Sequence, residues 1–449
     1  MTARPSLIPD PDSPVLPAND FRVLGKASAN LPATPATPAT ATASAAAQTS
    51  DSAPPAQPTS RLGGVWHAWR QVHGARAQRR EAPARAGLTT HRLALTSPWP
   101  EDVSALFAQA AVESIEISQA WYENLFSTVF QAHPGAALWV LRLNGVAVAA
   151  FPALVDPAPG GRELTALGNY YTALYAPTLA PDLLVADLAV LLHAMRQHYG
   201  NLGRLSFQPM DPQSSGHHKL LQALEMNGLL CFQYFRFGNW TLPNPGRWDS
   251  YFAGRSGNLR SRAKRATKRM TEEGGHIDIV TRPDLVASAL AAYWQVYRAS
   301  WKQYEGHPAF IDGLARWSAE QGQLRMGVYW LNGQPIAAQI WLVSHGKAEI
   351  FKVAYDEAYK ALSPGTALMA ALLKPALDQD RVTEVDFLIG DDAYKRDWMS
   401  HRRERWGIEA YDPLTLSGLL GLSKVLIARL ARRLKPAARE ATAADEPAA

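Results

Sequence analysis

Residues 348–398, AEIFKVAYDEAYKALSPGTALMAALLKPALDQDRVTEVDFLIGDDAYKRDW, contain the clearest pattern of secondary structure in this chain. The side chains up to Tyr355 alternate in the way that predicts a strand. Ser363 and Pro364, followed by a run of helix-forming residues, predict a helix that begins there. Residues 384–389 predict a second strand. The resulting strand–loop–helix–strand unit places a helix N-terminus beside the end of the first strand, a position that suits a phosphate group.

An earlier part of the chain repeats this organisation. LNGVAVAAFPALV at 143–155 aligns without a gap with LNGQPIAAQIWLV at 331–343, and the Asn-Gly pair, the Ala-Ala pair and the closing Leu-Val match in both. Asn-Gly between two apolar runs is a strong signal for a β-hairpin. Two matches in the same order, the second at Ser206 and Asp386 with the Phe that follows each, indicate a duplication. We therefore expect two tandem domains of the α/β class.

The C-terminal copy is similar to the core of the GNAT acyltransferases. More narrowly, it resembles the BioF-like and cellulose-biosynthesis-associated (CelD-type) acetyltransferases, which are relatives of the FemAB aminoacyl transferases. The residues that carry the resemblance are Lys352–Tyr359, Leu362–Thr366, Asp386-Phe387, Gly390-Asp391 and Tyr394-Lys395 with Trp398. The resemblance covers the second half well and the first half in outline. It implies tandem GNAT-like (acyl-CoA N-acyltransferase) domains with mixed sheets flanked by helices.

The expected organisation has five parts. Residues 1–89 form an Ala/Pro/Thr-rich tail with a basic segment, too poor in apolar side chains to build a core. Residues 90–245 form a degenerate GNAT-like domain on the acceptor side, because its tyrosine-rich strand is not followed by a Ser-Pro-Gly helix start. A basic linker helix at 246–275 precedes the C-terminal GNAT-like acetyltransferase domain at 276–413. Residues 414–449 form an amphipathic helix and a tail.

Composition restricts the class of protein. The 449 residues include one cysteine, Cys231, which excludes a disulfide framework and any zinc site built from cysteines. The histidines show no metal-ligand spacing, so no metal is expected. There is no signal-peptide pattern and no apolar stretch of the ~18 residues that a membrane span needs, which indicates a cytoplasmic location. The amphipathic helix from Leu416 has two interpretations, peripheral membrane contact and docking onto the preceding domain.

Acyl transfer needs a base for the incoming nucleophile and an acid for the leaving thiolate. The catalytic candidates are Asp386, Asp391, Tyr355 and Tyr394. Asp386 lies in the middle of a predicted strand, so it is either a base with a raised pKa or a structural partner of Lys352 or Lys395. Asp391 is either functional or a turn residue. The two tyrosines either donate a proton to the thiolate or pack.

The resemblance implies acyl-CoA, first of all acetyl-CoA, as the co-substrate. The candidates for binding it are Lys360, Ser363, Gly365, Thr366 and Lys395, although the spaced glycines of the GNAT acyl-CoA loop are missing. The candidates for binding the acceptor are Gln339, Lys352, Arg260, Lys264 and Arg265. The last three belong to GRSGNLRSRAKRATKRM at 254–270, which contains no acidic residue. That segment is either a solvated helix or a site for an anionic ligand.

The expected function is transfer of an acyl group from acyl-CoA to an amine or hydroxyl. A sugar or exopolysaccharide precursor as acceptor is implied by the resemblance alone. Two alternatives stay open. One is a FemAB-like transferase that takes its acyl group from aminoacyl-tRNA, which the basic segment favours and the lack of a long helical-hairpin insertion disfavours; nucleic acid is otherwise not expected as a partner. The other is a non-catalytic binding module on a GNAT fold.

Overall fold

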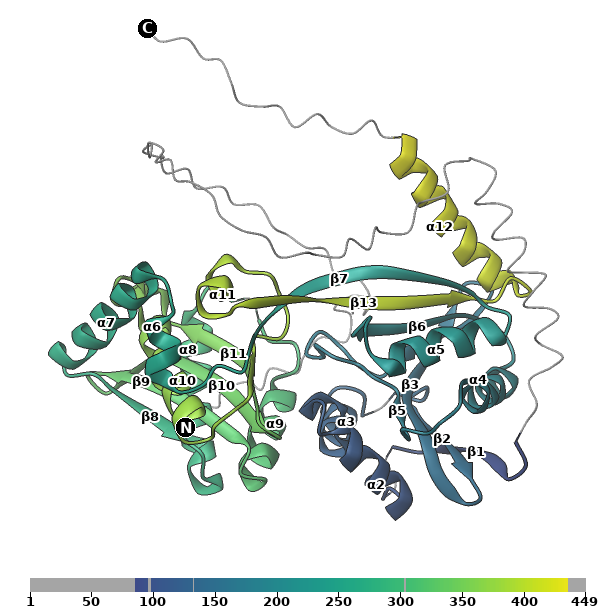
Figure 1. Ribbon diagram of the computed structural model, residues 1–449, viewed down its shortest axis with the longest axis horizontal. Helices are drawn as coiled ribbons and strands as arrows, with labels where there is room; N and C mark the ends of the chain where they lie inside the picture. Colours follow the sequence, from purple (N-terminus) through teal and green to yellow (C-terminus); the bar gives the residue numbers. More distant parts are fainter. Residues whose placement is uncertain (1–84, 96–97, 132, 303, 435–449) are drawn as a thin grey trace, which may run out of the picture. The chain divides into compact units, whose positions relative to one another are not determined.

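The computed structural model describes residues 85–95, 98–131, 133–302 and 304–434, with the side chains of 428–434 excepted (Figure 1). All of them belong to one compact unit, Thr59–Ala449. Most of the expected N-terminal tail and the end of the C-terminal tail lie outside the described residues. No helix in the described ranges combines the length and the apolar character that a membrane crossing requires.

The first half alternates strands with helices in a mixed order. Its elements are β1 Leu88–Leu93, α2 Glu101–Ala110, η1 Ile115–Ile117, α3 Gln119–Thr128, β2 Ala137–Leu143, β3 Val146–Ala158, β4 Gly161–Ala166, β5 Thr178–Leu179, α4 Val185–Tyr199, β6 Leu202–Met210, α5 Ser215–Met226 and β7 Leu230–Pro243. The sequence predicts a tyrosine-rich strand over 162–175. This prediction is wrong beyond Ala166, where β4 ends and the chain leaves the sheet.

The second half repeats the order. Its elements are α6 Trp248–Ala253, α7 Gly257–Glu272, β8 His276–Val280, η2 Pro283–Leu285, α8 Val286–Ala299, α9 Pro308–Glu320, β9 Leu324–Leu331, β10 Gln334–Ser344, β11 Lys347–Tyr355, η3 Glu357–Leu362, α10 Pro364–Asp378, β12 Glu384–Asp386, α11 Ala393–Trp398, β13 His401–Tyr411 and α12 Leu416–Leu434.

One sheet runs through both halves. Its strand order is β1-β2-β3-β4-β6-β13-β7-β12-β11-β10-β9-β8, with β5 attached to β3 outside this path. The path is symmetric about its centre: β4 and β6 are parallel in the first half, β11 and β12 are parallel in the second, and the pairings on either side of them are antiparallel. The duplication that the sequence predicts is therefore present in the sheet.

The two halves exchange a strand at the centre of the sheet. The last strand of the second half, β13, lies between β6 and β7 of the first half, and β7 in turn pairs with β12 of the second half. Figure 1 shows β7 and β13 as a long antiparallel pair that connects the two halves. Each half is thus completed by a strand of the other.

The two Asn-Gly pairs form the predicted hairpins. Asn144 and Gly145 connect β2 to β3 with φ values of 50° and 85°, and Asn332 and Gly333 connect β9 to β10 with 51° and 75°. Two successive positive φ values suit Asn and Gly and match the twist of the adjoining strands.

Helices cover both faces of the sheet. One face packs against α4 and α5 in the first half and against α7 and α10 in the second. On the other face, α2 and α3 share a single core cluster with α8 and α9. The contact is direct, since Asn124 Nδ2 of α3 donates a hydrogen bond to Phe310 O of α9 at 2.9 Å.

Candidate active site

A gap opens in the sheet where β11 and β12 separate. The two strands pair only through Lys347–Glu349 and Glu384–Asp386. Beyond these residues β11 continues to Tyr355, whereas the backbone that follows β12 turns away at Leu388, which has a φ of 52°. A β-bulge marks the same part of β11, since Ile340 of β10 faces Lys352 and the next residue faces Ile350, which leaves Phe351 unpaired. Such bulges change the direction of side chains. We call the space beyond Glu349 the β11–β12 gap.

The predicted helix start lies beside this gap. Ser363 caps α10 in the left-handed conformation with a φ of 55°, and Pro364 is the first helical residue. The N–H groups of Thr366 and Ala367 both donate to Ser363 O, and none of the described residues accepts a hydrogen bond from Gly365 N. The amide of Gly365 and the helix dipole are therefore what this terminus presents to an anion.

Gln339 holds that helix terminus in place. Its side chain is 2% exposed, donates to Gly365 O at 3.2 Å and accepts from Trp341 Nε1 at 2.9 Å. The expectation that Gln339 binds substrate is not supported by this position, because the amide is buried under α10 and both of its polar atoms have partners within the fold.

Glu305 and Lys352 form an ion pair at the bulge. Lys352 Nζ donates to Glu305 Oε2 at 2.9 Å, while Tyr170 and Tyr171 donate to the other carboxylate oxygen at 2.7 and 2.5 Å. Burial alone would raise the pKa of Glu305, but the ammonium of Lys352 and the hydroxyl of Tyr171 lower it. Lys352 Nζ also lies 4.7 Å from the centre of the Tyr171 ring. The first half thus supplies two tyrosines to a site of the second half.

Lys395 organises the opposite side of the gap. Its Nζ donates to Ile389 O at 2.5 Å and to Gly390 O at 3.3 Å, and pairs with Asp392 at 3.1 Å. Gly390 has a φ of 105°, and a Cβ built there would lie 3.1 Å from Lys395 Nζ. Burial lowers the pKa of Lys395, against the effect of Asp392. This lysine therefore fixes the turn that follows β12.

Residues between α8 and α9 contact β11. The ring of Trp301 lies 4.6 Å from that of Tyr355 at the end of β11. Burial, followed by the positive charge of Lys352, lowers the pKa of Lys302 to about 8, and Lys395 and Asp392 also act on it. Tyr304 of the same segment is 90% exposed.

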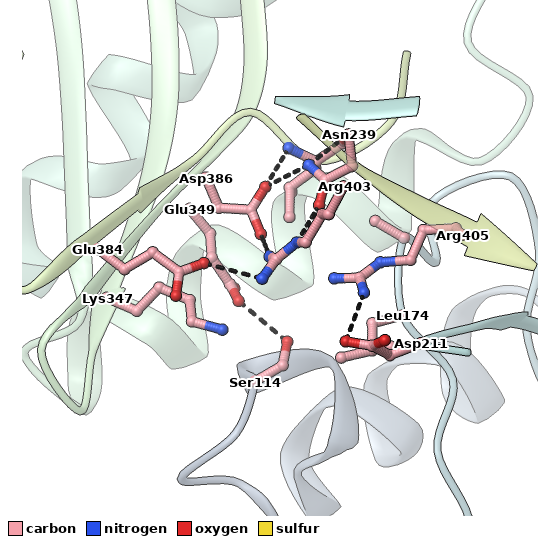
Figure 2. A network of polar contacts seen from close by, with 12 residues as sticks. Ser114, Leu174, Asp211, Asn239, Lys347, Glu349, Glu384, Asp386, Arg403 and Arg405 are labelled. Carbon is pink, nitrogen blue, oxygen red and sulfur yellow. Dashed lines mark hydrogen bonds and ion pairs between the residues drawn. The ribbon is translucent and has the colours of Figure 1, made fainter. Parts of the chain in front are cut away.

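Asp386 is part of a buried polar network (Figure 2). Its carboxylate accepts hydrogen bonds from Asn239 Nδ2 at 2.6 Å and Leu388 N at 2.7 Å, and it pairs with Arg403. Burial alone would raise the pKa of Asp386, but the charges of Arg403 and Arg405 lower it. The raised pKa and the lysine partner that the sequence suggests are therefore wrong. These contacts favour the structural interpretation, in which Asp386 joins β12 to β7 and β13.

Two more carboxylates lie close to this network. Glu349 accepts a hydrogen bond from Ser114 at 2.9 Å, and burial raises its pKa to about 7. Glu116 accepts from the backbone N–H of Ala173 at 2.9 Å and of Leu174 at 2.6 Å. Burial, together with the charge of Glu349, raises the pKa of Glu116 well above its usual range. These groups lie inside the protein and fasten the first half to β11.

The remaining candidates lie around the site. Asp391 pairs with Arg402 at 2.8 Å and accepts from Trp240 Nε1 at 2.6 Å, while Tyr394 packs its ring 5.7 Å from that of Phe387. Lys360 is exposed and lies 3.6 Å from Glu357. On α7, the exposed side chains of Arg260, Lys264 and Arg265 form no hydrogen bond or ion pair with other described residues.

The structure thus places Lys352 and Tyr355 on β11 and Lys395 after β12, on the two sides of the gap, and Asp386 in the network with Arg403. The residues that sequence reasoning missed are Tyr170, Tyr171, Lys302 and Glu305. The adjacent tyrosines were visible in a tyrosine-rich stretch, but nothing in it pointed to a carboxylate so far along the chain. In the described ranges, no histidine, cysteine, aspartate and glutamate side chains form a group suited to a metal ion.

Comparison with known families agrees with this geometry. Residues 257–396, from α7 to α11, match the family model of the acetyltransferase (GNAT) domain. The matched segment contains β11, α10, β12, Glu305 and Lys395. Over these residues, the second half is similar to the GNAT acetyltransferase domain. No curated protein matches the chain.

Several solved structures are similar to this chain. The crystal structure of FemX matches with a TM-score of 0.53 at 10% identity, over 74% of this chain and 99% of that chain. The C-terminal domain of a putative lysylphosphatidylglycerol synthetase from Agrobacterium fabrum matches with 0.43 at 13% identity, over 73% and 96%. A tandem GNAT protein from the clavulanic acid biosynthesis pathway matches with 0.42 at 15% identity, over 73% and 99%. The FemX match, across nearly all of that chain, supports the α/β fold.

Proposed function

We propose that this acyltransferase moves an acyl group, acetyl first of all, from acyl-CoA to an amine or a hydroxyl. The observation that carries the proposal is the β11–β12 gap. It lies within the acetyltransferase-domain segment, begins beside the N-terminus of α10, and is flanked by Lys352 and Lys395. A thioester in this gap has the anionic part of its carrier within reach of the helix terminus and its carbonyl near the bulge.

The residues proposed to hold CoA are Ser363, Gly365 and Thr366 at the start of α10, with the exposed Lys360. Lys395 is buried and bound to Ile389 O, Gly390 O and Asp392, so its proposed part is to shape the turn beside CoA. Tyr355 is the better placed proton donor for the leaving thiolate, because its ring closes one end of the gap against Trp301. Burial raises the pKa of Tyr355 and that of Tyr394, so both hydroxyls keep their proton at neutral pH, as a donor must.

The acceptor is proposed to enter between the two halves at Glu305. Tyr170 and Tyr171 of the first half bind this carboxylate directly, and two aromatic side chains of the segment between α8 and α9 are exposed, Trp301 at 53% and Tyr304 at 90%. Exposed rings offer apolar contact area together with a polar edge, which suits the face of a sugar. This supports a saccharide acceptor such as an exopolysaccharide precursor.

Calorimetric titration with acetyl-CoA, followed by a thiol-release assay with amino-sugar and hydroxyl acceptors, tests the proposal. We expect saturable binding and acceptor-dependent release of CoA. Saturable binding with no turnover on any acceptor would indicate the alternative of a non-catalytic binding module. Absence of acetyl-CoA binding would contradict the proposal.

Transfer from aminoacyl-tRNA is the second candidate, and the exposed basic face of α7 favours it. Charge reversal at Arg260, Lys264 and Arg265 together separates the two. If tRNA is the donor, the triple variant should lose affinity for aminoacyl-tRNA and show a flatter salt dependence. If acyl-CoA is the donor, no aminoacyl transfer from tRNA should occur in the wild type.

Peripheral membrane contact remains part of the proposal. Five apolar side chains of α12 are exposed: Leu416, Leu419, Leu420, Leu426 and Ile427. Their spacing places them along one side of the helix, and buried Leu422 lies at the edge of that side. Sedimentation with anionic and neutral vesicles checks this, and Leu419→Glu with Ile427→Glu should abolish any vesicle binding.

A further inference from the structure

Glu349 and Asp386 face each other at the end of the pairing between β11 and β12. The register places Glu349 opposite Asp386, and the β11–β12 gap begins directly after this pair. Neighbouring strands lie about 4.8 Å apart, so the two side chains stand next to each other on one face of the sheet. The preceding residues, Ala348 and Val385, belong to the core under α7 and α10. Both carboxylates therefore point to the opposite face.

The two carboxylates differ in their partners. Asp386 accepts a hydrogen bond from Asn239 Nδ2 at 2.6 Å and pairs with the guanidinium of Arg403. Glu349 is 2% exposed and accepts on Oε1 a hydrogen bond from Ser114 Oγ at 2.9 Å. Among the residues that the structure describes, its buried Oε2 has no hydrogen-bond partner, and no lysine, arginine or histidine forms an ion pair with it. Asp386 thus has a counter-charge in direct contact, whereas Glu349 has a hydroxyl.

The charged groups around Glu349 come from four elements. Lys347 of its own strand donates to a backbone carbonyl of the first half at 2.6 Å, and Arg403 of β13 is bound to Asp386. Asp386 of β12 and Glu116 of η1 add negative charge. A buried carboxyl with an unpartnered oxygen beside an ionised neighbour favours its neutral form. In agreement, burial raises the pKa of Glu349 to about 7.

Ser114 links this carboxyl to the first half. Its hydroxyl donates to Glu349 and accepts from the N–H of Glu116 at 3.2 Å. Glu116 in turn accepts from the N–H of Leu174 at 2.6 Å. Figure 2 shows Glu349 extending from β11 toward Ser114, with Asp386 on the adjacent strand. Ionisation of Glu349 therefore acts both on the end of the strand pairing and on the contact between the two halves.

We propose that Glu349 and Asp386 form a pH-sensitive latch at the mouth of the β11–β12 gap, closed while Glu349 is protonated and loosened when it is ionised. The proton passes from the carboxyl to water as the pair loosens, and like charges directly opposite each other then weaken the pairing. Because the folded pKa lies above the unfolded value of about 4.3, the latch is strongest at low pH and is lost as the pH rises through about 7.

Hydrogen exchange of the intact protein, corrected for the intrinsic pH dependence of exchange, tests the latch without any acyl-CoA. Mass spectrometry follows peptides that cover residues 111–118 and 344–352. In the wild type we expect protection of both to fall by about tenfold between pH 6 and pH 8. Glu349→Gln stays neutral and keeps an acceptor for Ser114, so its protection should not depend on pH. Glu123→Gln, at an exposed carboxylate of α3, is the matched control and should behave as the wild type.

Two results of the exchange experiment would refute the latch. One is wild-type protection that does not change with pH. The other is a Glu349→Gln variant that keeps the pH dependence of the wild type, because another group would then be responsible.

Calorimetric titration with acetyl-CoA at pH 6 and pH 8 tests the consequence for the site, which rests on the proposed function. The phosphates of CoA titrate with both proteins, so the ratio of wild-type to Glu349→Gln affinity isolates the latch. We expect this ratio to fall by about three- to tenfold at pH 8, because a loosened latch widens the gap. An unchanged ratio would refute the link to the gap. A wild type that binds no acetyl-CoA at either pH would refute the proposed function, while the exchange result still decides on the latch.

Discussion

The carboxylate of Glu305 lies 2.9 Å from Nζ of Lys352, and this pair joins the segment between α8 and α9 to the bulge of β11. Both side chains are largely buried, and Tyr170 and Tyr171 occupy the remaining carboxylate oxygen. The pair therefore joins the segment between α8 and α9 to the bulged strand, and through the two tyrosines it also joins the first half to the second.

Replacing one partner should be costly. In Glu305→Gln the ammonium of Lys352 stays buried without a counter-charge, and we expect the free energy of unfolding to fall by about 3–5 kcal/mol. Urea denaturation at neutral pH measures this. The matched control is Glu357→Gln, which removes an exposed ion pair whose Lys360 Nζ lies 3.6 Å from Glu357. Loss of this exposed pair should lower the free energy of unfolding by less than about 1 kcal/mol. Equal effects of the two variants would contradict the structural importance of the pair.

Asp386→Asn distinguishes a catalyst from a structural residue. The substitution leaves Arg403 partly uncompensated, so we expect a lower melting temperature and a loss of about 3–5 kcal/mol, with activity reduced only in proportion to the folded protein. Because the pKa of Asp386 is lowered in the folded state, its contribution is present above about pH 3.9 and disappears as the pH falls further. Asp391→Asn, at an exposed pair, is the control. An unchanged melting temperature with greatly reduced turnover would instead make Asp386 the base.

The raised pKa of Glu349 predicts that the free energy of unfolding depends on pH with the opposite sign. Its pKa is raised to about 7 in the folded state, above the value of about 4.3 in the unfolded chain. The free energy of unfolding should therefore decrease as the pH rises through this interval. Glu349→Gln keeps an acceptor for Ser114 and removes the charge, so it should stabilise the protein on the order of 1–3 kcal/mol at pH 8 and have little effect at pH 4. A variant that is less stable than wild type at pH 8 would argue that the ionised form is needed.

The start of α10 can be tested with one added charge. A Cβ at Gly365 would meet only a ring carbon of Tyr355 at 3.4 Å, so Gly365→Glu should fold normally. Its carboxylate would repel the phosphates of CoA, and we expect acetyl-CoA binding to weaken by about tenfold or more. Gly257→Glu, at the first residue of α7 with nothing within 4 Å of its Cβ, should bind normally. Calorimetric titration of both variants with acetyl-CoA tests this prediction. Normal acetyl-CoA binding by Gly365→Glu would mean that the phosphates bind elsewhere.

Much of the fold was predictable because its signals are local. Asn-Gly at both hairpins and Ser363 with Pro364 at the start of α10 act through the backbone conformations that these residues favour. The repeated segment around each hairpin then indicated the duplication. The strand exchange was not predictable, because β7 and β13 are ordinary strands by their sequence and only their neighbours in space make them unusual.

The site was predictable only in part. Lys352, Tyr355 and Lys395 lie within residues 348–398, and the structure places the first two on β11 and the third after β12, on the two sides of the gap. Glu305 was missed because it lies between two helices, in a segment with no periodic pattern. Its importance follows from contacts with residues that are distant in the sequence. Asp386 was singled out because it is a carboxylate inside a strand, but nothing in the sequence identified Arg403, on a distant strand, as its partner.

The position of β13 has a consequence for synthesis of the chain. The strand lies between β6 and β7, which are joined to one another by α5 and leave the ribosome long before it. Until β13 arrives, β6 has an open edge, and open edges pair readily with other chains. Contacts between residues so far apart in sequence also form slowly. The first half is therefore exposed to misassembly throughout translation of the second, and its sheet is completed by the last strand to be made.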